Sequence, residues 1–382
     1  MGRAVRRILD YLFSPASRLW RWTLGAALVV VLLGTAAALT AARPQPALPA
    51  AHAVAAPRKP APAPAALQAE ITALAAGYGE PVGIAVSDVE AGWTAQALGD
   101  VDFPQQSVSK LWIALTLLDQ VDHGAYRLED PVVMRIEDLS VFYQPIFARY
   151  GPDGYATTFD DLLARALVES DNAAADRLVR QVGGAGAIQA TLGRKGLTGI
   201  RAGGEERELQ ARISGMVWRP EYGLNNAFKT ARAQLPAAVR DAAMDAYLAE
   251  PPDRATPAGV VRALAALQRG ELLSASSTGR MIALMTRATT GPRRLKGGLP
   301  PGWTLAHKTG TGQDWRGAAV GINDVGLITA PDGRAYAVAV MIRRTRQPVP
   351  ARLMFMQAVS AAVVRHWSVE RGLPPPPEVP PY

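Results

Sequence analysis

Residues 103–124, FPQQSVSKLWIALTLLDQVDHG, contain the pattern on which the predicted fold is built. Apolar residues recur there at the three- and four-residue spacing of one helix face, at Leu111, Trp112, Leu115, Leu118 and Val121. Gly124 follows as a typical helix stop. The stretch therefore predicts a helix that buries one face and begins near Ser107.

Ser107 and Lys110 form an S-x-x-K motif that occurs once in the chain. At positions i and i+3 of a helix they share a face. A serine hydroxyl is a poor nucleophile until a base removes its proton, and a lysine with a lowered pKa can do so, whereas an arginine cannot. Taken alone, the motif is more typical of a helix-capping serine followed by an exposed lysine.

The segments on either side of this helix predict an α+β fold. A helix is expected over 66–78, followed by a hairpin over 81–98, and mostly helical sequence fills 107–290. Strands are expected over 303–310, 318–330 and 335–344, with a turn at 331–333 and a closing helix over 351–370. Strands at both ends with helices between them favour an antiparallel sheet over alternating β-α-β units.

Two further motifs occur once each, S-D-N at 170–172 and K-T-G at 308–310. Alone, the first is typical of a helix cap and the second of a strand end. Gly310 is expected to let a substrate approach the strand backbone. In the order S-x-x-K, S-D-N, K-T-G, the three motifs form the signature set of class A β-lactamases and penicillin-binding proteins.

On these motifs, and on the runs around 103–124, 284–312 and 323–340, the chain resembles class A β-lactamases over 66–370, most closely the branch that includes the PER and VEB enzymes. The resemblance implies a β-lactamase/transpeptidase-like sandwich, in which an antiparallel sheet flanked by helices lies beside a mostly helical lobe. It also implies a serine hydrolase that opens a β-lactam ring.

The resemblance also implies a role for each motif residue. Ser107 would be acylated, with Lys110 as base or proton carrier, and Ser170 would pass a proton to the leaving nitrogen. The substrate would be held by Asn172, Lys308, Thr309, Gly310 and Thr311. The backbone N–H groups of Ser107 and Thr311 would form the oxyanion hole. Tyr143 matches an aromatic residue at the site entrance, and Arg316 is expected to supply a second cation for the substrate carboxylate.

A lactamase differs from a penicillin-binding protein in that it hydrolyses its acyl-enzyme. The segment that carries the expected deacylating glutamate departs from the family's pattern. Glu206 begins Glu-Arg-Glu-Leu-Gln, which matches the family's E-x-E-L-N motif except that Gln210 replaces asparagine. Gly204 stands where the family often has arginine, and about three dozen extra residues precede Ala255. The insert is expected to reshape the acyl pocket or to cover the site. Either Lys110 or Glu206 could be the acylation base.

The N-terminal residues predict export. Residues 1–21 form a basic N-terminus, 22–42 an apolar segment long enough to span a bilayer, and 43–65 a Pro/Ala linker before the catalytic domain at 66–371 and a Pro-rich tail at 372–382. An uncleaved anchor would place the domain at the periplasmic face of the inner membrane, and a cleaved signal segment would release it into the periplasm.

Composition excludes several other classes. Residues 1–65 carry eight basic side chains and one acid, so seven of the eight net positive charges flank the apolar segment rather than a nucleic-acid surface. No cysteine is present, and the four histidines lack metal-site spacing, so neither a metal nor a cofactor is expected. We expect a monomer that acts on a β-lactam. Alternatives are a D-Ala-D-Ala carboxypeptidase or acyl-transferase acting on a peptidoglycan stem peptide, and a non-catalytic sensor of β-lactams or muropeptides.

Overall fold

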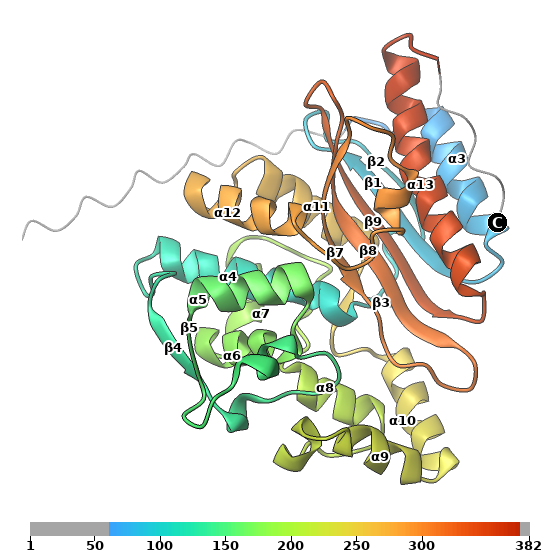
Figure 1. Ribbon diagram of the computed structural model, residues 1–382. Helices are drawn as coiled ribbons and strands as arrows, with labels where there is room; N and C mark the ends of the chain where they lie inside the picture. The colour runs from blue at the N-terminus through green and yellow to red at the C-terminus, as the bar shows by residue number, and fades with distance from the viewer. Residues whose placement is uncertain (1–60, 375–382) are drawn as a thin grey trace, which may run out of the picture. The chain divides into compact units, whose positions relative to one another are not determined.

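The computed structural model describes residues 61–374 (Figure 1). The predicted basic N-terminus, the apolar segment 22–42, most of the linker and most of the tail lie outside these residues. Within 61–374, no helix is both long and apolar enough to cross a membrane.

A five-stranded antiparallel sheet joins the two ends of the described chain, in the order β2-β1-β9-β8-β7. Its strands are β1 (Val82–Asp88), β2 (Thr94–Ala97), β7 (Thr304–Gly310), β8 (Ala319–Thr329) and β9 (Ala335–Thr345). The N-terminal hairpin pairs with the C-terminal strands through β1 and β9, where Ala85 lies opposite Ala339. The predicted antiparallel sheet is therefore confirmed.

Both faces of the sheet are covered by helices, because successive side chains of each strand point to opposite faces. On β9, Tyr336, Val338 and Val340 join the core beneath α3 (Ala65–Gly77) and α13 (Val349–Glu370). The small side chains of Ala337 and Ala339 join the other core, on the face where α11 (Pro257–Gln268) packs (Figure 1). The two alanines let α11 approach the sheet closely at this point.

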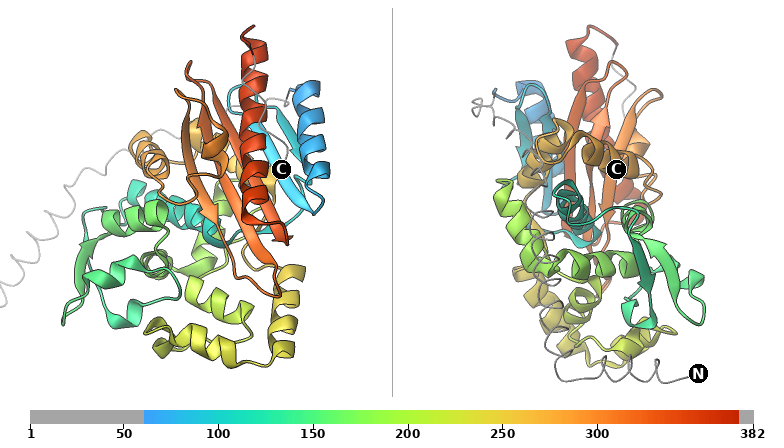
Figure 2. Two further views of the ribbon diagram at one scale, coloured as in Figure 1. Left: turned by 45° about the vertical axis from the view of Figure 1, so that its right-hand side comes forward. Right: turned by 90° about the vertical axis from the view of Figure 1, so that its left-hand side faces the viewer.

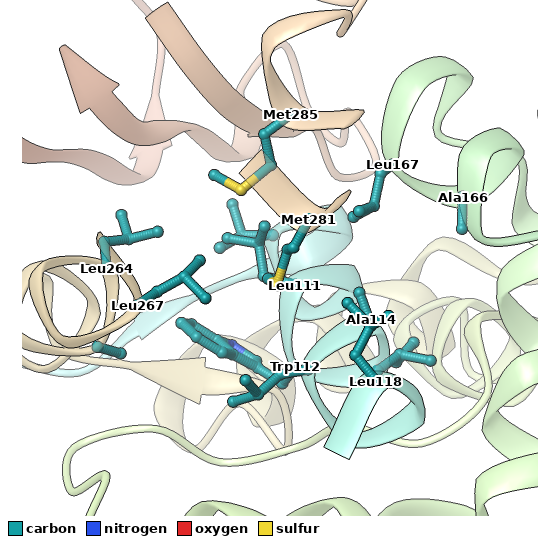
Figure 3. Packing of buried hydrophobic residues seen from close by; sticks show 14 of the residues in the cluster. Leu111, Trp112, Ala114, Leu118, Ala166, Leu167, Leu264, Leu267, Met281 and Met285 are labelled. Atoms are coloured by element: carbon teal, nitrogen blue, oxygen red, sulfur yellow. The ribbon is translucent and has the colours of Figure 1, made fainter. Parts of the chain in front are cut away.

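The predicted helix after Ser107 is α4 (Lys110–Asp122), and it runs through the centre of the helical lobe. Leu111, Ala114 and Leu118 share one buried cluster with Met281 and Met285 of the C-terminal half of the chain (Figure 3). Trp112 packs toward Leu264 and Leu267 of α11. The same core includes residues of α5 (Phe159–Ala164), α6 (Asn172–Val182), α7 (Gly184–Arg194) and α12 (Ala275–Thr286).

Two small strand pairs were not predicted. β3 (Phe103–Pro104) pairs with β6 (Arg254–Ala255), and β4 (Pro131–Met134) pairs with β5 (Tyr155–Thr158). Strands of two to four residues are too short for an alternating pattern to stand out from a loop.

The extra residues form a compact helical insert. It follows α8 (Glu206–Ile213) and consists mainly of α9 (Ala227–Gln234) and α10 (Ala237–Ala249), which lie together at the lower end of both views in Figure 2. The helix predicted near 236–250 is thereby confirmed. Tyr247 and Met244 of α10 share a small buried cluster with Leu209 and Val320, so the insert packs against both α8 and the sheet.

Gly310, the last residue of β7, is required by the packing of the protein itself. A Cβ atom built there would lie 2.4 Å from the carbonyl oxygen of Gln105 and 2.9 Å from Asn323 Nδ2. Asn323 Nδ2 in turn donates to the carbonyl oxygens of Pro104 and Gln105. The glycine therefore lets the segment that leads to Ser107 lie directly against the sheet. That it also lets a substrate approach the strand backbone remains a prediction.

We predict that Gly310→Ala lowers the free energy of unfolding by about 1–3 kcal/mol, because the added methyl group must displace backbone. The expected fall in Tm is several degrees, measured by thermal denaturation. Gly279→Ala is the matched control: it lies in α12 with no atom near its Cβ position, and the substitution should leave the Tm unchanged or slightly raised. Equal Tm values for Gly310→Ala and the parent would contradict this account of the motif.

Candidate active site

Ser107 and Lys110 lie together where α4 begins. Ser107 is in a 3-10 turn over Gln106–Ser109, and Lys110 is the first residue of α4. Lys110 Nζ is 3.1 Å from Ser107 Oγ. Gln106, just before the serine, has φ 52°, a conformation that costs a non-glycine residue about 1–3 kcal/mol. The carboxylate of Asp253 holds it there by accepting from the Gln106 backbone N–H at 2.7 Å.

Lys110 is buried and surrounded by oxygen atoms. Besides Ser107 Oγ, its Nζ lies 2.8 Å from the carbonyl oxygen of Ser170, 3.2 Å from Ser170 Oγ and 2.6 Å from Asn172 Oδ1. Burial lowers the pKa of Lys110, and the carboxylate of Glu206, the strongest opposing charge, raises it again. The net direction is downward, which favours the neutral amine that can accept a proton.

The S-D-N motif forms the turn between two helices of the lobe. A π-helical turn over Arg165–Glu169 ends at Ser170, whose φ of 64° is left-handed. Asp171 caps α6 by accepting from the backbone N–H of Ala174 at 2.9 Å, and it also accepts from Ile146 N at 2.7 Å. Asn172 donates from Nδ2 to the carbonyl oxygen of Val141 at 2.8 Å. The motif is thus both a helix cap and the wall that presents Ser170 to Lys110.

The K-T-G strand reaches the same place from the sheet. Lys308 is fully buried, and its Nζ donates to Ser170 Oγ at 2.9 Å and to the Thr309 carbonyl oxygen at 3.1 Å. Burial lowers the pKa of Lys308 well below its usual value, and the charges of Lys110 and Arg294 lower it further. Ser170 Oγ therefore lies between two lysine amines, one from the lobe and one from the sheet.

A cavity of about 440 Å³ opens over these groups. Of the residues predicted for the site, seven line it: Ser107, Tyr143, Ser170, Asn172, Glu206, Thr309 and Thr311. Lys110 and Lys308 are buried beside it, and Gly310 faces the segment before Ser107.

Arg316 does not join this group, contrary to its predicted role. Its guanidinium pairs with Asp241 of the insert, at 2.6 Å and 2.9 Å, and it lines a separate cavity. Arg294 lines the main cavity instead, where it donates to Thr311 Oγ1 at 2.7 Å and to the Gly310 carbonyl oxygen at 2.9 Å. No sequence pattern indicated that Arg294 would take the place predicted for Arg316. Arg294 precedes a 3-10 turn and reaches the strand only through the tertiary fold.

Glu206 is the first residue of α8, and the buried carboxyl group of Asp176 in α6 holds it in position. Asp176 accepts from the backbone N–H of Glu206 at 2.5 Å, from Arg207 N at 3.1 Å and from Ser140 Oγ at 2.6 Å. This side chain satisfies two of the free N–H groups at the start of α8. Gly204 stands where the family often has an arginine before this glutamate. A different arginine, Arg180 of α6, pairs with Glu205 next to Glu206.

Gln210 is held by protein groups on every side. Its Nε2 donates to Glu206 Oε1 and to Gln106 Oε1, both at 2.8 Å, and its Oε1 accepts from Gln313 Nε2 at 2.8 Å. Both amide hydrogens are therefore used inside the protein. Gln210 orients Glu206 but has no hydrogen left for a water molecule.

The insert extends this network to the nucleophile. Tyr247 of α10 accepts from Gln106 Nε2 at 2.5 Å and donates to Asp253 Oδ1 at 3.0 Å. Burial raises the pKa of Asp253 to about 6. Sequence reasoning missed Gln106, Tyr247, Asp253 and Gln313, since none of them belongs to a motif.

No metal centre is evident in residues 61–374, where no cluster of three or more histidine, aspartate or glutamate side chains is placed to hold an ion. His307, next to Lys308, is buried in the sheet and bonds Asp324 Oδ1 through Nδ1 at 2.7 Å. Its role is therefore structural.

Comparison with known proteins covers most of the chain. Residues 66–367 match the family described as the beta-lactamase enzyme family. The chain is 29% identical to the β-lactamase VEB-1 of Pseudomonas aeruginosa over 267 residues, 70% of this chain and 78% of that protein. It is 30% identical to the extended-spectrum β-lactamase PER-1 of the same organism over 244 residues, 63% and 68% of the two chains.

Solved structures show the same architecture. A β-lactamase from Chitinophaga pinensis aligns with a TM-score of 0.63 and 26% identity, over 80% of this chain and 99% of that one. A variant of the last common ancestor of class A β-lactamases of Gram-negative bacteria aligns with a TM-score of 0.62 and 28% identity, over 80% and 100%.

We predict that Asp176→Asn changes how stability depends on pH. Burial raises the pKa of Asp176 to about 7, above the value near 4 of the unfolded chain. Between about pH 4 and 7 the folded protein holds a proton that the unfolded chain has released, so the contribution of Asp176 to stability is full below pH 4 and is lost as the pH rises to 7. Denaturant unfolding of parent and Asp176→Asn from pH 4 to 8 should show the difference narrowing or reversing toward high pH. Exposed Asp153→Asn serves as control, and a parallel pair of pH curves for parent and Asp176→Asn would contradict the assignment.

Proposed function

The chain belongs to the beta-lactamase enzyme family, as a serine hydrolase of class A, and on that premise we propose that it hydrolyses the β-lactam amide through an acyl-enzyme on Ser107 that a Glu206-activated water releases. One observation carries the proposal. Ser107, with Lys110 Nζ 3.1 Å from its hydroxyl, lines the same cavity as Glu206.

Acylation would begin when the Ser107 oxygen attacks the lactam carbonyl carbon and its proton leaves for a base. The lowered pKa of Lys110 and its contact with Ser107 support the neutral amine as that base, and Glu206 remains the alternative through a bridging water. The carbon–nitrogen bond then breaks, and the leaving nitrogen takes a proton through Ser170, whose hydroxyl contacts the amines of both Lys110 and Lys308.

Deacylation would depend on Glu206. One carboxylate oxygen accepts from Gln210, which leaves the other to remove a proton from water as it attacks the ester carbonyl. The ester bond to Ser107 breaks and the proton returns to the serine oxygen. Because Gln210 has no free hydrogen, we infer that Glu206 and the acyl-enzyme together hold the water.

The substrate carboxylate would bind beside the β7 strand. Thr309, Thr311 and Arg294 face the cavity there, while the amine of Lys308 lies beneath. A bound carboxylate would add a negative charge near Lys308, offset the desolvation that lowers its pKa and favour its ammonium form.

We further propose that this chemistry takes place outside the cytoplasm. The proposal rests on the apolar segment 22–42 and the arginines before it, which lie outside the described residues.

We expect Glu206→Gln to acylate and then stall, because the amide cannot take a proton from water. Deacylation of a chromogenic cephalosporin should slow about 100- to 10,000-fold, and mass spectrometry should find the adduct on Ser107. Glu208→Gln is the matched control on the same helix, since Glu208 is exposed, and it should turn over like the parent. A parent chain that itself stops after one equivalent would overturn the hydrolase proposal in favour of a sensor, and a parent chain that neither turns over the substrate nor forms an adduct would exclude both.

Arg294→Gln should raise KM for a penicillin about 10- to 100-fold with a smaller effect on kcat, because a charge-assisted contact to the carboxylate is lost. Steady-state kinetics measures this, with Arg293→Gln as control, since Arg293 is the exposed neighbour. An unchanged KM in a variant with normal Tm would remove Arg294 from the carboxylate site.

A further inference from the structure

A second cavity of about 290 Å³ adjoins the active site and is rich in cations. Lys229 and Arg232 of α9 and Arg240 of α10 line it, together with Trp315 and Arg316 from the loop after β7. Arg232 also lines the main cavity, so one guanidinium borders both.

Three of these cations lack a carboxylate partner. Within residues 61–374, Lys229, Arg232 and Arg240 form no ion pair within 4 Å. Asp314 also lines the cavity, and its carboxylate acts on Arg232 from beyond ion-pair distance. The Asp241 carboxylate accepts from Arg316 Nε at 2.9 Å, Arg316 Nη2 at 2.6 Å and Trp315 Nε1 at 2.6 Å, so it is paired with Arg316.

The arginines are also held in place rather than free in solvent. Arg240 stacks on Trp315, with its guanidinium carbon 3.5 Å from the ring centroid. Arg232 donates from Nη2 to the Asp314 carbonyl oxygen at 2.9 Å, while its buried Nε has no hydrogen-bond partner. Burial and the charge of Arg240 lower the pKa of Arg232, and the Asp314 carboxylate opposes them. Like charges kept together in this way favour an incoming anion.

The cavity is within reach of a substrate bound at Ser107. Thr311, whose N–H is proposed for the oxyanion hole, stands three residues before Asp314, so the backbone bonded to Arg232 is at most about 11 Å away. Phe142 lines the main cavity and packs edge-on against Phe228, with ring centroids 5.1 Å apart. Phe228 and Arg232 are i and i+4 on α9, so the contact between Phe142 and the buried Phe228 fixes α9, and with it Arg232, beside the main cavity.

We propose that Lys229, Arg232 and Arg240 form a subsite for a carboxylate on the acyl side chain of the β-lactam, so that the enzyme favours substrates with a second negative charge. The inference rests on the proposed β-lactam hydrolysis. It assigns the insert a role in specificity, in addition to its support of Gln106.

The test compares one oxyimino-cephalosporin bearing a carboxyalkyl group on its oxime with the methyl ester of that group. Ser107→Ala prevents acylation, so calorimetry measures a true Kd for each ligand. In that background the acid should bind roughly five- to tenfold more tightly than the ester, about 1 kcal/mol, and the preference should weaken with added salt. Adding Arg232→Gln and Arg240→Gln should reduce the preference to less than twofold, because the Kd of the acid rises more than the Kd of the ester.

Two further variants serve as a control and as a milder test of the subsite. Arg219→Gln, an exposed arginine of the same insert, should keep the preference for the acid. Lys229→Gln removes only an exposed side chain and should reduce the preference partly, even if the double substitution misfolds. The subsite is overturned if acid and ester have equal Kd values in Ser107→Ala alone. It is also overturned if the preference for the acid survives Arg232→Gln and Arg240→Gln. If neither ligand binds Ser107→Ala nor acylates the native chain, the proposed function fails and the subsite with it.

Discussion

The burial of Lys110 is the constraint on which the site depends. An amine removed from water is costly unless oxygen atoms surround it. Ser107 supplies one from the start of α4, and Ser170 and Asn172 supply the others from the turn before α6. Lys308 reaches the same Ser170 hydroxyl from the sheet. Ser170 therefore contributes both to the burial of Lys110 within the lobe and to the contact between lobe and sheet beside the nucleophile.

Two strained residues mark this meeting point. Gln106 and Ser170 both have positive φ without being glycine, and each precedes or belongs to a reactive motif. Such a conformation persists only where the surroundings determine it. Asp171 anchors the turn at Ser170, and Asp253 anchors Gln106. Tyr247 joins Asp253 to the Gln106 side chain, so part of the support for the nucleophile comes from the insert.

Side chains outside the insert supply contacts that the motif comparison suggested were missing. Gln210 in place of asparagine spans Glu206, Gln106 and Gln313, which the extra methylene of its side chain makes possible. Arg180 reaches Glu205 from α6, beside the glycine that stands where arginine is frequent. The glutamate loop is thus built differently, yet its carboxylate still faces the cavity.

The sequence by itself determined the elements and the family. Helical and alternating periodicity predicted α4, α13 and the five-stranded sheet, since long segments repeat their burial pattern many times. Three ordered motifs identified the resemblance to class A β-lactamases, and the runs around them identified the PER and VEB branch; both are confirmed. Only the tertiary structure decided that Arg294, not Arg316, faces the cavity, and that Gln106, Tyr247 and Asp253 support Ser107. These contacts join residues far apart in the chain, and their geometry depends on how helices pack on the sheet, which no local pattern encodes.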